Sequence, residues 1–156
     1  MRHEQIQRLI IAALLAALCC VATLMIQVPS PMNGYVNLGD GLVLLSGWLL
    51  GPGYGFAAAG LGSALADLIT GYSHYAPATF IIKGLMALIS CRLKPRWLGG
   101  ILAEGWMVLG YFLFACLLMG EGWAAAASIP GNLIQGAVGL AAALALEKVT
   151  QRLRLR

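Results

Sequence analysis

The stretch from residue 34 to residue 85 is almost entirely apolar and small, yet it also contains ionisable side chains. Its strongly polar residues are Asn37, Asp40, Asp67, His74 and Lys83. An ionisable side chain at hydrocarbon depth costs at least about 2.5–3.5 kcal/mol, so it is retained mainly where it faces a polar cavity or a charged partner. The stretch therefore predicts a membrane protein that holds something polar within the bilayer.

The composition of the whole chain supports a membrane protein. Of its 156 residues, 60% are hydrophobic and 10% are charged, which excludes an ordinary soluble domain. The length suits one membrane-embedded domain over residues 1–156. The spacing of the four cysteines resembles neither a metal site nor a disulfide framework, so we interpret them as small core residues.

The apolar runs predict an all-α, polytopic bundle of six transmembrane helices. The expected helices are Ile6–Val28, Leu38–Leu50, Tyr54–Thr70, Pro77–Cys91, Leu98–Met119 and roughly Ser128–Val149. A loop containing Pro29, Pro31, Asn33 and Gly34 follows the first helix, and residues 51–53, Gly-Pro-Gly, separate the second from the third. The second helix, about 20 Å long, is too short to cross a bilayer unaided.

The basic residues predict the orientation of this bundle. Nine of the ten lie in the N-terminal tail, the 92–96 loop or the C-terminal tail, and the tenth is Lys83 inside a helix. By the positive-inside rule, these three segments and both termini are cytoplasmic, which places a multi-pass protein in the cell membrane. The same rule accounts for the basic tails, so we expect no binding to nucleic acid. The expected environment, and one of the expected partners, is the lipid bilayer.

Nine polar or aromatic side chains are candidates for binding a substrate. They are Asn37, Asp40, Tyr72, His74, Tyr75, Lys83, Glu104, Asn132 and Gln135. Asn132 and Gln135 lie one turn apart and share a helix face. Glu104 shares a face with Tyr111 but is expected nearer the inner side, whereas most of the other candidates fall on the outer side.

Several candidates also have a structural interpretation. Asp67 and Lys83 carry opposite charges on neighbouring helices, which favours a structural ion pair between them. Asp40 is also a candidate helix cap, and Tyr72 and Tyr75 are candidates for an interfacial aromatic belt. Both ligand contact and a structural role stay open for Glu104 and for the Asn132/Gln135 pair.

Catalytic patterns do not emerge from the sequence. It shows no plausible Ser/His/Asp set, no zinc-binding H-E-x-x-H, no paired carboxylates on one helix and no P-loop. His74 is a lone histidine on an expected loop, so we expect no metal site. We predict a protein that is not an enzyme and has no cofactor, so any energy from ATP comes from a partner.

The sequence resembles the substrate-binding S component of energy-coupling factor (ECF) transporters. The motifs that carry the resemblance are P-x-P-x-x-G-Y-V-N-L-G-D, G-P-x-x-G, G-S-A-L-A-D-L, G-Y-x-x-Y-A-P and I-K-G-L, all between Pro29 and Leu85. Two overlapping A-x-x-x-A pairs precede them, and E-x-x-M-V-x-x-Y-F and P-x-N-x-x-Q follow. The riboflavin-type branch, with candidates for hydroxymethylpyrimidine and other vitamins, is the most similar.

The resemblance implies capture of a water-soluble vitamin or precursor from outside, under a lid formed by the first loop. It also implies docking through alanines of the first helix onto a membrane T subunit coupled to two ATPases. Carried onto this chain, the docking pair is Ala13/Ala17, with Ala12/Ala16 as the alternative. We expect hydroxymethylpyrimidine or a pyridoxine-like compound rather than riboflavin, because the ligand side shows few large aromatic residues. A solitary facilitator without ATPases and a structural membrane scaffold are the alternatives.

Overall fold

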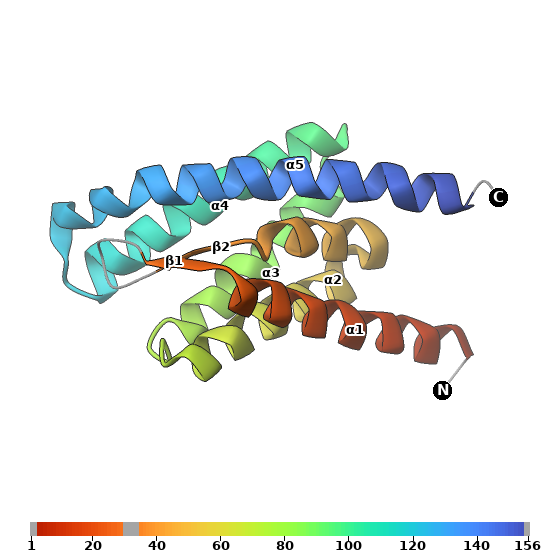
Figure 1. The fold of residues 1–156 in the computed structure, drawn as a ribbon, viewed down its shortest axis with the longest axis horizontal. Helices are drawn as coiled ribbons and strands as arrows, with labels where there is room; N and C mark the ends of the chain where they lie inside the picture. Colours follow the sequence, from red (N-terminus) through yellow and green to blue (C-terminus); the bar gives the residue numbers. More distant parts are fainter. Residues whose placement is uncertain (1–2, 30–34, 155–156) are drawn as a thin grey trace.

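The computed structural model describes residues 3–29 and 35–154, and these residues are largely helical (Figure 1). In chain order the elements are α1 (His3–Met25), β1 (Gln27–Pro29), β2 (Tyr35–Asn37), α2 (Asp40–Thr70), α3 (Ala76–Arg92), α4 (Arg96–Leu113), the π-helix η1 (Phe114–Leu118), the 3-10 helix η2 (Gly122–Ser128) and α5 (Ile129–Arg154). The predicted all-α membrane architecture is confirmed in this general form.

The predicted break at residues 51–53 lies inside α2 and divides it into two arms. Gly51 has φ of 76° and ψ of −168°, a conformation that favours glycine, and Pro52 follows it. The arms fold back on each other so closely that a Cβ on Gly55 would lie 2.7 Å from the Ser46 carbonyl oxygen. The two arms thus correspond to the second and third predicted helices.

Four of the described helical stretches are long and apolar enough to cross a membrane. They are His3–Met25, Asp40–Thr70, Arg96–Leu118 and Gly122–Val149. The helix α3 is shorter, at 17 residues. Large apolar side chains cover the outside of the bundle, with Ile10 61% and Leu133 57% exposed, as expected for a surface that faces lipid rather than water.

The bundle has two opposite ends, which differ in the segments that lie there. The start of α1, the α3–α4 turn and the end of α5 lie toward one end, and the β1–β2 ribbon lies toward the other (Figure 1). At the first end Arg96 pairs with Glu147, and its guanidinium carbon lies 5.6 Å from the ring centroid of Trp48. This contact ties α2, α4 and α5 together.

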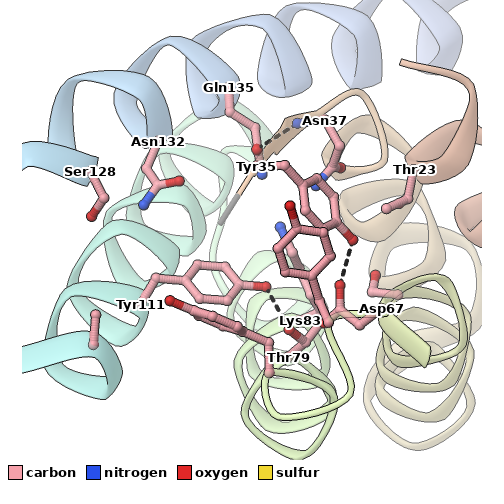
Figure 2. Close-up of a pocket in the computed structure, with 14 residues that line it drawn as sticks. Thr23, Tyr35, Asn37, Asp67, Thr79, Lys83, Tyr111, Ser128, Asn132 and Gln135 are labelled. Carbon is pink, nitrogen blue, oxygen red and sulfur yellow. Dashed lines mark hydrogen bonds between the residues drawn. The ribbon is translucent and has the colours of Figure 1, made fainter. Parts of the chain in front are cut away.

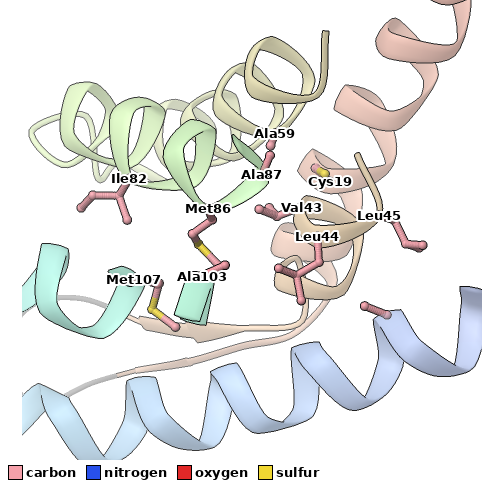
Figure 3. Packing of buried hydrophobic residues seen from close by; sticks show 11 residues of the cluster. Cys19, Val43, Leu44, Leu45, Ala59, Ile82, Met86, Ala87, Ala103 and Met107 are labelled. Atoms are coloured by element: carbon pink, nitrogen blue, oxygen red, sulfur yellow. The ribbon is translucent and has the colours of Figure 1, made fainter. Parts of the chain in front are cut away.

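Small side chains let these helices pack closely. The core cluster combines alanines with a few larger residues of α1–α5: Cys19, Val43, Leu44, Leu45, Ala59, Ile82, Met86, Ala87, Ala103, Met107 and Ala143 (Figure 3). A Cβ added to Gly47 would collide with the Ala87 carbonyl oxygen, so α2 and α3 approach each other at backbone distance. Cys19 is fully buried in this core, as expected, but the other three cysteines, Cys20, Cys91 and Cys116, are only partly buried.

The main difference from the predicted elements is the ribbon. Helix α1 ends at Met25 rather than Val28, because Gln27–Pro29 pairs antiparallel with Tyr35–Asn37. Pro29, which we expected in a loop, belongs to β1. The other expected loop residues, Pro31, Asn33 and Gly34, lie outside the described residues.

Candidate functional site

A cavity lies beside the ribbon and is bordered by all five α-helices (Figure 2). The centre of a water-sized sphere can occupy about 50 Å³ of this cavity. Its walls are formed by Thr23, Tyr35, Asn37, Ser63, Asp67, Tyr72, Tyr75, Thr79, Lys83, Tyr111, Ala115, Ser128, Asn132 and Gln135. The walls therefore combine aromatic faces with amide, hydroxyl, carboxylate and ammonium groups.

The cavity brings together six of the nine candidates from the sequence. These are Asn37, Tyr72, Tyr75, Lys83, Asn132 and Gln135. The other three, Asp40, His74 and Glu104, do not line it. His74 is exposed and packs against Tyr75 in a tilted arrangement, with ring centroids 4.9 Å apart.

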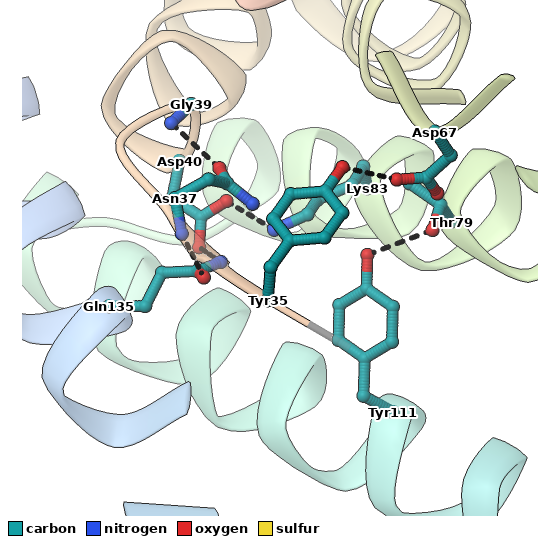
Figure 4. Close-up of polar contacts among 9 residues, drawn as sticks. All are labelled: Tyr35, Asn37, Gly39, Asp40, Asp67, Thr79, Lys83, Tyr111 and Gln135. Carbon is teal, nitrogen blue, oxygen red and sulfur yellow. Dashed lines mark hydrogen bonds and ion pairs between the residues drawn. The ribbon is translucent and has the colours of Figure 1, made fainter. Parts of the chain in front are cut away.

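Asp40 holds the polar groups at the back of the cavity in place (Figure 4). The carboxylate forms an ion pair with Lys83 and accepts a hydrogen bond of 2.7 Å from Nε2 of Gln135. Asp40 and Lys83 are 0% and 2% exposed, so the charges compensate each other away from solvent. Asp40 does not cap α2: the cap position is Gly39, without a side-chain cap hydrogen bond, so the alternative capping role is wrong.

Gln135 also fastens the ribbon to α5. Its Oε1 accepts a hydrogen bond of 2.8 Å from the backbone N–H of Asn37, at the end of β2. The Asn37 side chain turns back, and its Oδ1 accepts a hydrogen bond of 2.8 Å from the Gly39 N–H, a local turn typical of asparagine. One glutamine thus links α5, the ribbon and the first residue of α2.

The predicted ion pair between Asp67 and Lys83 is corrected by the structure. Lys83 pairs with Asp40, and Asp67 instead accepts a hydrogen bond from the Tyr35 hydroxyl of β2. Burial raises the pKa of Tyr35, and the adjacent Asp67 carboxylate raises it further, so the phenol stays protonated as a donor. Asp67 lines the cavity, and its hydrogen-bond donor, Tyr35, is neutral.

Glu104 lies behind the cavity rather than in its wall. The side chain is 6% exposed, and a Cβ added to Gly136 or Gly139 of α5 would lie 3.1 Å from one of its carboxylate oxygens. Neither of its oxygens has a hydrogen-bond partner among the described residues. This position agrees with the inner location expected from the direction of α4 and places the side chain outside the cavity wall.

Tyrosines form much of the cavity wall, and the sequence analysis selected only some of them. The rings of Tyr35 and Tyr72 lie 5.0 Å apart, and those of Tyr75 and Tyr111 lie 6.4 Å apart. The Tyr111 hydroxyl donates to Oγ1 of Thr79 at 3.1 Å, and Nζ of Lys83 lies 5.5 Å from the Tyr111 ring centroid. Our expectation of few large aromatic residues on the ligand side was therefore wrong.

Some cavity residues were missed for lack of a sequence signal, and others despite one. The lining residues absent from the candidates are Thr23, Tyr35, Ser63, Asp67, Thr79, Tyr111, Ala115 and Ser128. Ser63 and Asp67 lie four residues apart on α2 and therefore share a face, which was a usable signal. Tyr35 belongs to a three-residue strand, too short for a periodic pattern.

The alternative docking pairs lie on different faces of α1. Ala12 is buried and Ala16 is half-buried, whereas Ala13 and Ala17 are exposed. The first pair packs within the bundle, and the second is accessible to another helix.

The arrangement suits reversible binding of a small polar aromatic molecule. Tyrosine faces provide stacking surfaces, and amide, hydroxyl and charged groups fix orientation. Within residues 3–29 and 35–154, no cluster of three His, Cys, Asp or Glu side chains is placed to hold a metal ion.

Comparison with known proteins identifies related sequences along nearly the whole chain. The family model of the ECF-type riboflavin transporter S component matches residues 3–152. A Pyrococcus woesei protein described only as an uncharacterised protein in the gap 3′ region is 37% identical over 128 residues, which cover 77% of this chain and 85% of that one. The thiamine precursor transporter HmpT of Lactococcus lactis subsp. cremoris (strain MG1363) is 28% identical over 154 residues, covering 97% and 92%.

The fold is also found in a solved structure. The S component of a bacterial ECF transporter superposes with a TM-score of 0.80 at 22% sequence identity, covering 97% of this chain and 99% of that one. At this identity the likeness concerns the fold alone.

Proposed function

This chain belongs to the family of ECF-type riboflavin transporter S components, and from this premise we propose that its cavity binds a vitamin precursor built on a single nitrogen-containing ring. The family consists of multi-pass membrane proteins that serve vitamin uptake as transporter components rather than as enzymes. Its members work with a vitamin-like substrate and a T and ATPase module. The identity of the ligand and the residues that bind it are our proposal.

The size of the cavity favours a small ligand. The centre of a water-sized sphere can occupy only about 50 Å³ of the cavity, so the space between its walls is limited. We therefore propose a ligand with one substituted six-membered ring rather than the three fused rings of a flavin.

The chemistry of the walls favours an aromatic ring with polar edges. Tyr72 and Tyr111 present aromatic surfaces. The carboxamide of Asn132 is buried, lines the cavity and makes no hydrogen bond with the described part of the chain, which leaves its donor and acceptor to a ligand. The single observation that carries the proposal is this aromatic and polar cavity inside an apolar bundle.

The name of HmpT points in the same direction. A thiamine precursor is the substrate that the name gives for this relative, which is 28% identical. Hydroxymethylpyrimidine is a one-ring molecule of this kind, and a pyridoxine-like compound has a similar size. We therefore propose one of these as the ligand, now because of the size of the cavity rather than a shortage of aromatic residues.

Thermal unfolding of the purified protein with a vitamin panel tests this function. A ligand present at 100 times its dissociation constant stabilises the folded state by about 2.7 kcal/mol. Hydroxymethylpyrimidine or pyridoxine should raise the midpoint by several degrees, and riboflavin should not. A rise with riboflavin alone contradicts the one-ring proposal, and no rise with any vitamin favours a structural scaffold.

We propose that Ala13 and Ala17 form the face of α1 that contacts the T subunit. Both are exposed and small, so a partner helix can approach at backbone distance. Ala13→Trp should reduce uptake by cells that contain the ECF module by about tenfold or more, because it prevents this approach. Ligand binding by the isolated protein should not change.

The matched control for docking is Ala145→Trp, the same substitution at an exposed position of α5. It should leave both uptake and binding near the wild-type level. Equal uptake in the Ala13 and Ala145 variants would show that this face of α1 is not the docking surface. Uptake by cells that lack the ATPases would instead favour a solitary facilitator.

The orientation remains the one inferred from the basic residues: six crossings with both termini in the cytoplasm. The common end of α1 and α5 and the position of the α3–α4 turn support it (Figure 1). Lys94→Cys, in a background without native cysteines, should resist an impermeant thiol reagent added to intact cells. Rapid labelling at this position would contradict the orientation.

A further inference from the structure

Among the described residues, two fully buried polar atoms of the cavity wall lack hydrogen-bond partners. They are Oγ of Ser63 and Oδ2 of Asp67, both buried, with no partner among the described residues. Ser63 and Asp67 lie one helical turn apart on the second arm of α2, and both line the cavity. The two atoms therefore belong to one small area of its wall.

The missing partner of Ser63 is unusual within α2. Ser46 donates to the Leu42 carbonyl oxygen and Thr70 donates to the Ala66 carbonyl oxygen, each at 2.8 Å, so these hydroxyls are satisfied by their own helix. Ser63 makes no such bond. Because buried polar groups are nearly always paired, a free hydroxyl and a free carboxylate oxygen together indicate a place for a bound group.

The charges around Asp67 indicate what kind of group this is. Oδ1 of Asp67 accepts from the neutral Tyr35 hydroxyl, and Lys83, the buried cation of the described residues, is paired with Asp40. No cation among the described residues forms an ion pair with Asp67. The Tyr35 and Tyr72 rings stand nearby, and aromatic faces attract cations. Carboxylates form their strongest hydrogen bonds with charged N–H donors.

We propose that Ser63 and Asp67 form the subsite for the N–H-donating edge of the ligand, and that this edge is an amino group next to a protonatable ring nitrogen. This inference rests on the function proposed above and specifies the ligand as an amino-substituted nitrogen heterocycle. Oδ2 of Asp67 accepts the N–H that carries positive charge, and Oγ of Ser63 pairs with the neighbouring group. Tyr35 keeps its bond to Oδ1, so the subsite forms without breaking a contact.

Two pyrimidines of nearly equal size test the subsite. One is 4-amino-5-hydroxymethyl-2-methylpyrimidine, and the other is its 4-oxo analogue, which presents a carbonyl where the first presents an amino group. Equilibrium dialysis against the purified wild-type protein in lipid nanodiscs should show a preference of about ten- to a hundredfold for the amino compound, the range expected for a hydrogen bond to a charged group.

Substitutions within the subsite should remove this preference. Asp67→Asn keeps the size and still accepts from Tyr35, but it should bind the two pyrimidines within about threefold of each other. Ser63→Ala should lower the affinity for the amino compound by about fivefold, as expected for the loss of one neutral hydrogen bond. The control is Ser90→Ala on α3, because Ser90 is equally buried, donates to the Ala87 carbonyl oxygen and lies outside the cavity wall.

The outcomes separate the subsite from the proposed function. Wild-type protein that binds the oxo compound as tightly as the amino compound overturns the subsite but leaves a one-ring ligand in place. Asp67→Asn protein that keeps the full preference for the amino compound over the oxo compound also overturns the subsite. If Asp67→Asn does not fold, the wild-type preference and Ser63→Ala decide. If folded wild-type protein binds neither pyrimidine nor any other one-ring vitamin, both proposals fail.

Discussion

Lys83→Met should lower the free energy of unfolding by about 3–5 kcal/mol, because it leaves the carboxylate of Asp40 buried without its cation. Both side chains are almost completely buried and form an ion pair between α2 and α3. Asp40→Asn should cost a comparable amount, since it leaves the ammonium uncompensated. The double variant Asp40→Asn/Lys83→Met should recover part of the loss, as measured by denaturant unfolding in detergent micelles.

A second double-mutant cycle is the control for this pair. Asp67 lines the cavity as Lys83 does, but its hydrogen bond comes from Tyr35. Asp67→Asn combined with Lys83→Met should therefore show a clearly smaller coupling energy than the Asp40 cycle. Strictly additive losses for Asp40 and Lys83 would contradict the observed pairing.

Gln135→Ala should reduce both stability and ligand affinity. The substitution removes a hydrogen bond to the Asn37 N–H and one to the Asp40 carboxylate, together worth about 2.5–4 kcal/mol. It also releases the ribbon from α5 next to the cavity, so affinity should fall by about tenfold or more. Unfolding curves and equilibrium dialysis with hydroxymethylpyrimidine measure the two effects.

The matched variant on the same helix face is Asn132→Ala. Asn132 lines the cavity but makes no hydrogen bond with the described residues. Asn132→Ala breaks no hydrogen bond among the described residues, so it should cost clearly less stability than Gln135→Ala, and it should weaken ligand binding by about fivefold. Equal losses of stability in the two variants would contradict the separate roles that the structure gives them.

The helices were predictable because long apolar runs and glycine–proline breaks act locally. The break at Gly51 and the helix that begins near Pro77 both appear where the sequence predicts them. The ribbon was not predictable in the same way. Strands of three residues are too short to show a periodic pattern, and their pairing depends on where the chain folds back on itself.

The residues of the cavity were only partly predictable. A sequence pattern indicates on which face of a helix a residue lies, but not which residues of that face reach the cavity. Glu104 and Tyr111 share a helix face, but seven residues separate them by about 10 Å along the axis. Only Tyr111 reaches the cavity wall. The partner of Lys83 was open for the same reason: both arms of α2 offer a carboxylate, and only the packed structure selects Asp40 over Asp67.

The most direct test of the account is a calorimetric titration of a variant in which the cavity is filled. Ala115→Phe places a ring at a buried lining position without removing a polar group. The account predicts one molecule of hydroxymethylpyrimidine bound for each wild-type chain, and no measurable binding to an Ala115→Phe protein that remains folded and monodisperse. Undiminished binding to the folded variant would contradict the claim that this cavity is the ligand site.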